Sequence, residues 1–189
     1  MTRAALRGVG GGFVFCAVAL GCVRSKPEPE VAPRAEVQAQ TKRGPVVQFG
    51  FESIDGKRLD AASMRGRLTV IGFVTTYDYA SQAEARVLSA VMRRHTPRVN
   101  VALLVLEQPD NRPLVEAFGA TLGLPYPIAL ADAATIAGAG PFAGLHHVPS
   151  VVILDKQGRE AWRHLGLVEE PPIHAALRSI EAADASAGP

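Results

Sequence analysis

Short apolar runs alternate with amphipathic stretches along the chain from residue 46 onward. The apolar runs are rich in β-branched residues and have the length of strands that are buried on both faces. Strands are expected over 46–51, 67–75, 99–106, 151–154 and 159–165. Apolar residues recur at the spacing of one helical face over 81–95, 113–122 and 173–180. Strands that alternate with helices predict an α/β fold, in which a β-sheet is flanked by helices.

The first 22 residues have the order of a secretory leader. Two arginines precede a short apolar stretch that is too short and too rich in glycine for a membrane-spanning helix. The end of this stretch, Leu20-Gly21-Cys22, resembles a bacterial lipobox, in which the cysteine is lipidated and becomes the mature N-terminus. We therefore expect residues 1–22 to be a lipoprotein signal peptide, with lipidation on Cys22. The alternative is an ordinary signal peptide or an uncleaved anchor, with Cys22 incidental.

Residues 23–45 differ from both the leader and the domain. They hold four prolines, charges of both signs and almost no bulky apolar side chain, so they are expected to be a disordered tether. The pattern of strands and helices then defines one domain over 46–182. The small and polar residues 183–189 are expected to be a disordered tail. Because Val23 and not an aspartate follows Cys22, the outer membrane is favoured over the inner membrane for the anchor.

Composition and charge narrow the classes of partner. The chain has 189 residues, of which 48% are hydrophobic and 20% charged, enough for the core of one domain. Its formal net charge of +2 equals the two arginines of the leader, so the rest of the chain is formally neutral. A chain that is formally neutral beyond its leader and has no basic stripe in its sequence is not expected to bind nucleic acid.

Two motifs carry a resemblance to a known family. Residues 66–84, GRLTVIGFVTTYDYASQAE, align without gaps with the pattern G-K-x-V-L-V-N-F-W-A-T-W-C-P-P-C-R-x-E of TlpA-like thioredoxins. Residues 148–158, VPSVVILDKQG, resemble the V-P-T-x-x-L-I-D-x-x-G of the same family. The resemblance spans about 46–180 and implies a thioredoxin-like fold with a central mixed β-sheet flanked by helices. At the level of the family, it implies a thiol–disulfide oxidoreductase.

The redox cysteines of that family are replaced in this chain. Asp78 and Ser81 stand at the two positions where the family carries its C-P-P-C pair. Thiol–disulfide exchange needs a thiolate to attack and a second thiol to resolve the mixed disulfide, and neither a carboxylate nor a serine hydroxyl can do this. Cys16 and Cys22 are the two cysteines of the chain, and both lie in the leader. The sequence therefore predicts no dithiol chemistry and no cofactor.

Asp78 and Ser81 fall at the start of the first predicted helix. Aspartate is a favoured N-cap residue, and Ser81 with Glu84 also fits the spacing of a capping box. One interpretation is that the redox pair was exchanged for residues that cap the helix. The other is a catalytic Asp78, which is the less common role for a carboxylate.

Pro149 corresponds to the cis-proline that faces the active-site helix in this family. The resemblance implies a cis peptide bond here, and a groove that binds an extended polypeptide without chemistry. Phe142 is expected to add aromatic surface to that groove. The alternative is that the proline only shapes the fold. The residues of the predicted groove are Tyr77, Asp78, Tyr79, Ser81, His147, Val148 and Pro149.

Histidines offer a third function. We expect no metal site, and Asp78 and His147 are the weak candidates for binding zinc or copper. Adjacent residues on an extended segment point to opposite sides, so at most one of His146 and His147 faces the site. The remaining histidines, His95, His164 and His174, are expected at the surface or at helix ends, and Trp162 in the core. The leading hypothesis is a non-enzymatic module of the bacterial cell envelope that binds a protein or peptide partner. An oxidoreductase and a metal-handling module are the alternatives.

Overall fold

The computed structural model describes residues 44–186. The predicted signal peptide, the lipidation of Cys22, most of the predicted tether and the last residues of the predicted tail lie outside the described residues. Within residues 44–186, none of the helices is both long enough and apolar enough to cross a membrane.

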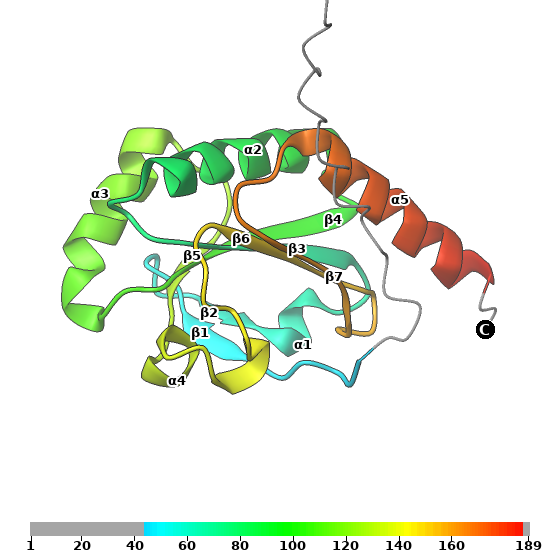
Figure 1. The fold of residues 1–189 in the computed structure, drawn as a ribbon, viewed down its shortest axis with the longest axis horizontal. Helices are drawn as coiled ribbons and strands as arrows, with labels where there is room; N and C mark the ends of the chain where they lie inside the picture. The colour runs from blue at the N-terminus through cyan, green and yellow to red at the C-terminus, as the bar shows by residue number, and fades with distance from the viewer. Residues whose placement is uncertain (1–43, 187–189) are drawn as a thin grey trace, which may run out of the picture. The chain divides into compact units, whose positions relative to one another are not determined.

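The centre of the fold is a five-stranded sheet with the strand order β5-β4-β3-β6-β7 (Figure 1). β3, β4 and β5 are parallel to one another, whereas β6 runs antiparallel to β3 and β7 runs antiparallel to β6. The predicted central mixed sheet is therefore confirmed, although the sequence pattern did not indicate the short strand β5. The strands are β3 (Leu68–Val74), β4 (Val99–Val105), β5 (Ile128–Leu130), β6 (Ser150–Leu154) and β7 (Glu160–Leu165).

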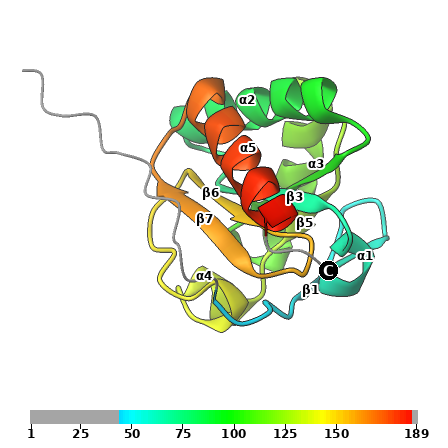
Figure 2. The ribbon, with the colours of Figure 1, turned by 90° about the vertical axis from the view of Figure 1, so that its right-hand side faces the viewer.

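Three long helices cover one face of the sheet, and a hairpin with short helices covers the other, as Figures 1 and 2 show. Each face buries its own hydrophobic cluster against the sheet. The long helices are α2 (Tyr79–His95), α3 (Arg112–Leu122) and α5 (Glu170–Ser186). The second face is covered by β1 (Gly50–Glu52), β2 (Arg58–Asp60), α1 (Ala61–Met64) and α4 (Ala133–Ile136). Two 3-10 turns, η1 (Pro109–Asn111) and η2 (Gly140–Phe142), complete the elements.

β3 fixes the position of α2. All residues of this strand are buried, because both faces of the sheet are covered. Gly72 in its middle lies beneath the side chains of Leu88 in α2 and Leu103 in β4, which leave no space for a Cβ atom. The helix therefore packs closely on the strand, and its first residue lies just beyond the carboxyl end of β3.

The boundaries of the domain differ from the expected ones at two points. The predicted strand over 46–51 is shorter, since β1 begins at Gly50 and Val46 instead forms a bridge with Arg159. At the other end, α5 continues to Ser186, so the prediction of a disordered tail is wrong for residues 183–186. Alanines such as Ala182 and Ala183 favour helix, and the helix continues directly from the turn in which Ile180 is buried against the domain.

Candidate functional site

Asp78 caps the N-terminus of α2. Its backbone is extended, and its carboxylate accepts hydrogen bonds from the backbone N–H groups of Ala80 at 3.3 Å and Ser81 at 2.9 Å. The Ser81 hydroxyl donates a third hydrogen bond to Oδ2 at 2.8 Å. This hydroxyl is the main reason that the pKa of Asp78 lies below its usual value, and the two N–H groups act in the same direction. The capping interpretation of Asp78 is thus confirmed.

Ser81 is fully buried beneath the loop that leads into α2. Its Oγ atom accepts a hydrogen bond from the backbone N–H of Thr75 at 3.2 Å while it donates to Asp78. The hydroxyl group is therefore used on both sides within the protein and is closed to solvent. At the two positions of the family cysteines, the chain has a network that holds the turn between β3 and α2.

Glu84 does not form the capping box that its spacing from Ser81 predicts. Asp78 is the N-cap residue, so Ser81 and Glu84 already lie inside the helix. The Glu84 side chain is fully buried, and its Oε2 atom accepts a hydrogen bond from the backbone N–H of Val168 at 2.9 Å. Its Oε1 atom has no hydrogen-bond partner, and burial raises the pKa of Glu84 to about 7. The carboxyl group connects α2 to the segment that precedes α5.

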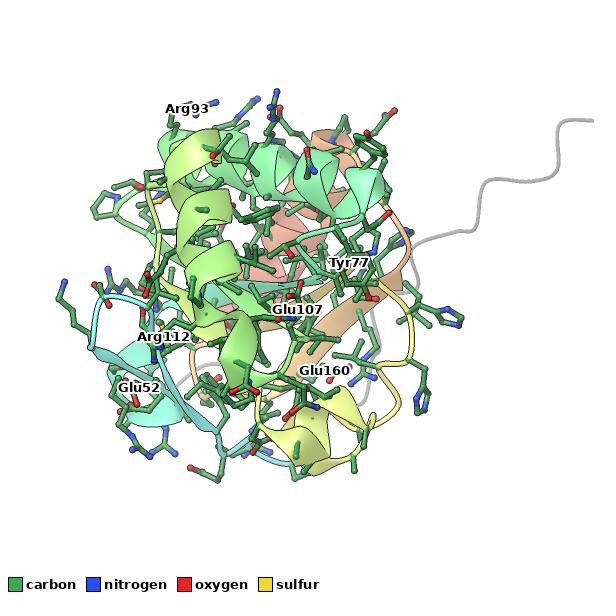
Figure 3. All side chains as sticks on the ribbon, turned by 90° about the vertical axis from the view of Figure 1, so that its left-hand side faces the viewer. Glu52, Tyr77, Arg93, Glu107, Arg112 and Glu160 are labelled. Atoms are coloured by element: carbon green, nitrogen blue, oxygen red, sulfur yellow. The ribbon has the colours of Figure 1, made fainter. Side chains whose placement is uncertain are left out.

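Glu107 holds the same loop from the other side, and sequence reasoning missed it. Its Oε1 atom accepts hydrogen bonds from the backbone N–H of Thr76 at 2.6 Å and from the Thr76 hydroxyl at 2.7 Å. Its Oε2 atom accepts a third from the side-chain amide of Asn111 at 2.9 Å. Figure 3 shows Glu107 beneath the loop that carries Tyr77. The sequence feature that could have indicated this residue is its position, since Glu107 is a carboxylate directly after the apolar run 99–106.

Three loops meet at this end of the sheet. Phe73 near the end of β3 pairs with Ser150 at the start of β6. The loop after β3 and the loop before β6 therefore lie next to each other at the same end of the sheet. The Val148–Pro149 peptide bond is cis, as predicted. The carbonyl of Pro149 accepts a hydrogen bond at 2.8 Å from Gly166, just after β7. We call the surface formed by residues 75–81, 146–149 and 165–167 the loop face.

The aromatic side chains of the loop face differ from the expectation in one case. Tyr77 and Tyr79 are strongly exposed, with 78% and 86% of their surfaces open to solvent. Phe142, in contrast, is buried, and its ring packs against those of Phe73 and Phe49. The expectation that Phe142 adds surface to the groove is wrong, because the residue belongs to the second hydrophobic cluster.

The histidines near the loop face are both exposed. The His146 ring lies against Gly138, and His147 directly precedes the cis-proline loop. Within residues 44–186, no three His, Cys, Asp or Glu side chains are grouped closely enough to hold a metal ion. The Asp78 carboxylate is already engaged by the helix N-terminus, so its pairing with His147 stays a prediction without structural support.

His95 and His174 form a pair that the sequence did not indicate. Nε2 of His95 and Nδ1 of His174 lie 2.9 Å apart and join the last turn of α2 to α5. His174 is buried in the second turn of α5, so the surface, one of the two positions expected for it, is excluded. Its Nε2 atom lies 3.4 Å from a carboxylate oxygen of Glu170. Burial, followed by the neighbouring His174, lowers the pKa of His95. Trp162 is buried, as predicted.

Cavities open at more than one place on the part of the domain that the structure describes. One, of about 270 Å³, adjoins the loop face and lies between the start of α2 and α3. Its walls are formed by Thr76, Gln82, Leu114, Ala117, Phe118, Thr121 and Leu122. A larger cavity, of about 640 Å³, lies between the β1–β2 turn and the loop before β5, on a part of the surface that includes none of the predicted site residues.

No protein-family model matches the chain, and no curated protein matches it in sequence. Solved structures do resemble it. A DsbF homologue from Corynebacterium diphtheriae has a TM-score of 0.67 at 18% sequence identity, and the match covers 79% of this chain and 96% of the other. A secreted thiol–disulfide isomerase from Corynebacterium glutamicum has a TM-score of 0.65 at 19% identity, with 79% and 95% covered. A thioredoxin-family thiol:disulfide interchange protein from Chlorobium tepidum has a TM-score of 0.63 at 18% sequence identity, and the match covers 75% of this chain and 99% of the other.

These matches extend over nearly the whole length of the other proteins. At less than one identical residue in five, they establish the architecture and leave the activity to be argued from the residues of this chain. They agree with the two sequence motifs and with the cis-proline before β6. The chain has the thioredoxin-like fold of the thiol–disulfide interchange proteins.

Proposed function

We propose that the chain is an exported thioredoxin-like module that binds an extended segment of a protein or peptide partner in the cell envelope and carries out no thiol chemistry. The observation that carries this proposal is the Asp78 carboxylate at the N-terminus of α2. Its hydrogen bonds to Ala80 and Ser81 use the N–H groups that would stabilise a thiolate at this position. In this proposal the chain has the thioredoxin-like fold, and Asp78 caps α2 at the position where the family pattern has a reactive cysteine.

The distribution of exposed apolar side chains supports binding at the loop face. Tyr77 and Tyr79 stand on one side of Asp78, while Leu165 and Leu167 flank Gly166, whose N–H is bonded to Pro149. Exposed apolar side chains that are gathered on one surface are typical of an interaction site. Tyrosine supplies a large contact area at a low cost in conformational entropy.

The cavity of about 270 Å³ adds a pocket at the edge of this surface. Its volume is below the range of about 300–1,000 Å³ that is usual for small-molecule sites, and its walls are largely apolar. Leu114, which is exposed, and Phe118 line it from α3, and Thr76 joins it to the loop face. We infer that it receives one bulky apolar side chain of the bound segment.

A thiol–disulfide oxidoreductase is the second candidate, and the named activities of the similar structures favour it. The buried Glu84 and the cis-proline also match the family pattern. The positions of the cysteines argue against an oxidoreductase. Cys16 and Cys22 are the two cysteines of the chain, and the domain from residue 44 contains neither of them. A dithiol mechanism at Asp78 and Ser81 would have no sulfur to oxidise.

Export and anchoring are part of the proposal. The leader-like order of residues 1–22 and the secreted proteins among the similar structures favour the envelope. We propose that the mature chain starts at a lipidated Cys22, in the outer membrane. Mass spectrometry of the membrane-extracted protein tests this: the expected mass is that of a chain starting at Cys22 plus acyl groups. An unmodified chain that begins at Met1 would contradict it.

Site-specific photocrosslinking tests the binding proposal. Benzoylphenylalanine at position 79 of the full-length chain, expressed in its own cells, is expected to give a discrete adduct with a partner polypeptide. The matched control carries the same group at Arg93, an exposed residue near the other end of α2. The Leu114→Ser exchange is expected to weaken the adduct at position 79. Equal adducts at both positions, or none at position 79, would contradict binding at the loop face.

A further inference from the structure

Charged residues are distributed unevenly between the two ends of the sheet, although the domain from residue 46 onward holds 13 basic and 15 acidic residues and so has a formal net charge of −2. The segments at the end that carries the loop face, residues 75–85, 106–111, 146–149 and 165–170, contain no lysine or arginine. The opposite end carries six exposed basic side chains. They are Arg65, Arg67, Arg93, Arg94, Arg98 and Lys156.

Two hydrogen bonds bring the segments that carry these six residues beside one another. Gly66 donates a hydrogen bond at 2.9 Å to the carbonyl of Lys156, which brings the β6–β7 turn beside the segment before β3. The Arg67 guanidinium donates to the carbonyl of Pro97 at 3.2 Å, which brings that segment beside the turn after α2. Arg93 and Arg94 lie in the last turn of α2, directly before this turn. We call the surface formed by these six residues the basic end.

Acidic side chains offset only part of this charge. Glu181 in α5 lies 4.0 Å from the Arg98 guanidinium, and Asp184 follows one turn later. Asp155, in the β6–β7 turn, is buried, and its carboxylate accepts hydrogen bonds from the backbone N–H groups of Gln157 and Arg159. The basic end therefore keeps a net positive charge on an exposed surface.

The chain enters the domain at the same end. Arg159 donates a hydrogen bond at 3.4 Å to the carbonyl of Gly44, and Val47 donates one at 2.8 Å to the carbonyl of Gly158. Gly44 thus lies beside the β6–β7 turn that carries Lys156. The segment that leads toward Cys22 joins the domain at its basic end, opposite the loop face.

From this coincidence of charge and chain entry, we propose that the basic end docks on the anionic phospholipid surface of the membrane that holds the chain. The proposal rests on the anchoring described above, which brings the domain within reach of a bilayer. Basic side chains near an anionic bilayer are attracted to its headgroups over about a Debye length. Docking in this orientation points Tyr77, Tyr79 and the neighbouring cavity away from the membrane, toward a partner in the aqueous compartment.

Hydrogen–deuterium exchange of the full-length chain on vesicles tests the docking. The two probes are vesicles of phosphatidylcholine alone and vesicles of phosphatidylcholine with about one third phosphatidylglycerol. On the anionic vesicles, residues 64–67, 93–98 and 155–158 are expected to exchange about threefold more slowly than on the neutral ones. Because the attraction is electrostatic, about 0.5 M NaCl is expected to remove the difference.

Two charge-matched variants separate the basic end from charge in general. Arg93→Gln/Arg94→Gln/Arg98→Gln is expected to abolish the protection. Lys57→Gln/Arg58→Gln/Arg86→Gln removes three positive charges from exposed positions outside the basic end. This control variant is expected to keep the protection from exchange. Equal exchange on both kinds of vesicle, or equal loss of protection in both variants, would overturn the proposal. The crosslink at position 79 does not depend on docking, so failure here leaves the proposed binding function standing.

Discussion

The hydroxyl group of Ser81 donates a hydrogen bond of 2.8 Å to the Oδ2 atom of Asp78. These two residues occupy the positions that hold a redox pair of cysteines in the TlpA-like pattern. The Asp78 carboxylate also accepts hydrogen bonds from the N–H groups of Ala80 and Ser81 at the start of α2, and the Ser81 hydroxyl accepts one from the N–H of Thr75. Both side chains are therefore engaged in holding the turn between β3 and α2.

Loss of the Asp78 cap is expected to cost stability. Asp78→Ala should lower the free energy of unfolding by about 1–2 kcal/mol, because the first N–H groups of α2 and the Ser81 hydroxyl lose their acceptor. Asp78→Asn keeps an acceptor and should cost much less. Urea unfolding followed by circular dichroism at pH 7 measures both. Equal losses in the two variants would contradict the capping role.

The Asp78 cap also makes the free energy of unfolding depend on pH. The pKa of Asp78 is lowered in the folded state, chiefly by the Ser81 hydroxyl, so the ionised cap stabilises the fold above the unfolded pKa of 3.8. That contribution is lost as the pH falls through the folded pKa. The difference in unfolding free energy between the wild type and Asp78→Asn is therefore expected to shrink below about pH 4.

Glu84 is expected to make the fold less stable as the pH rises, which is the opposite of the effect of Asp78. Burial raises its pKa from 4.5 to about 7, so the neutral acid is favoured in the fold, and stability is lost as the pH rises through about 7. Glu84→Gln keeps the acceptor for the Val168 N–H and cannot ionise. It should stabilise the protein by up to about 3 kcal/mol at pH 8.5 and by little at pH 4.5. A stability gain that is the same at both pH values would contradict this account.

Glu107 is buried in the turn after β4, and its removal is expected to cost stability. Glu107→Ala removes the acceptor of the Thr76 N–H, the Thr76 hydroxyl and the Asn111 amide, and should cost about 2–3 kcal/mol. The exposed Glu116 on α3 supplies the control, since Glu116→Ala should change stability by less than about 0.5 kcal/mol. Faster hydrogen exchange at Thr76 in the Glu107 variant would locate the effect in the loop below Tyr77.

Much of this fold could be predicted from the sequence. The apolar runs of β3 and β4 are long, and the two motifs around Asp78 and Pro149 indicate the architecture. The N-cap was predictable because it depends on residues within one helical turn. β5 was not, since a strand of three residues after a proline-rich loop carries little periodicity.

Contacts between distant residues could not be predicted. Glu84 bonds to Val168 and His95 meets His174, and neither pair has a local spacing that marks it. The misplaced Phe142 has the same cause, because nothing near it in the sequence tells a core aromatic residue from an exposed one. The candidate site was therefore found by its motif, and the groups that hold it were visible only in the fold.

Reduction of insulin disulfides by the full-length chain tests the central claim most directly. The account predicts a rate equal to that of the reductant alone. Asp78→Cys/Ser81→Cys serves as the positive control and is expected to gain activity, because the N–H groups at the start of α2 would favour a thiolate at position 78. Turnover by the wild-type chain above the blank would contradict the account and return the protein to the oxidoreductases.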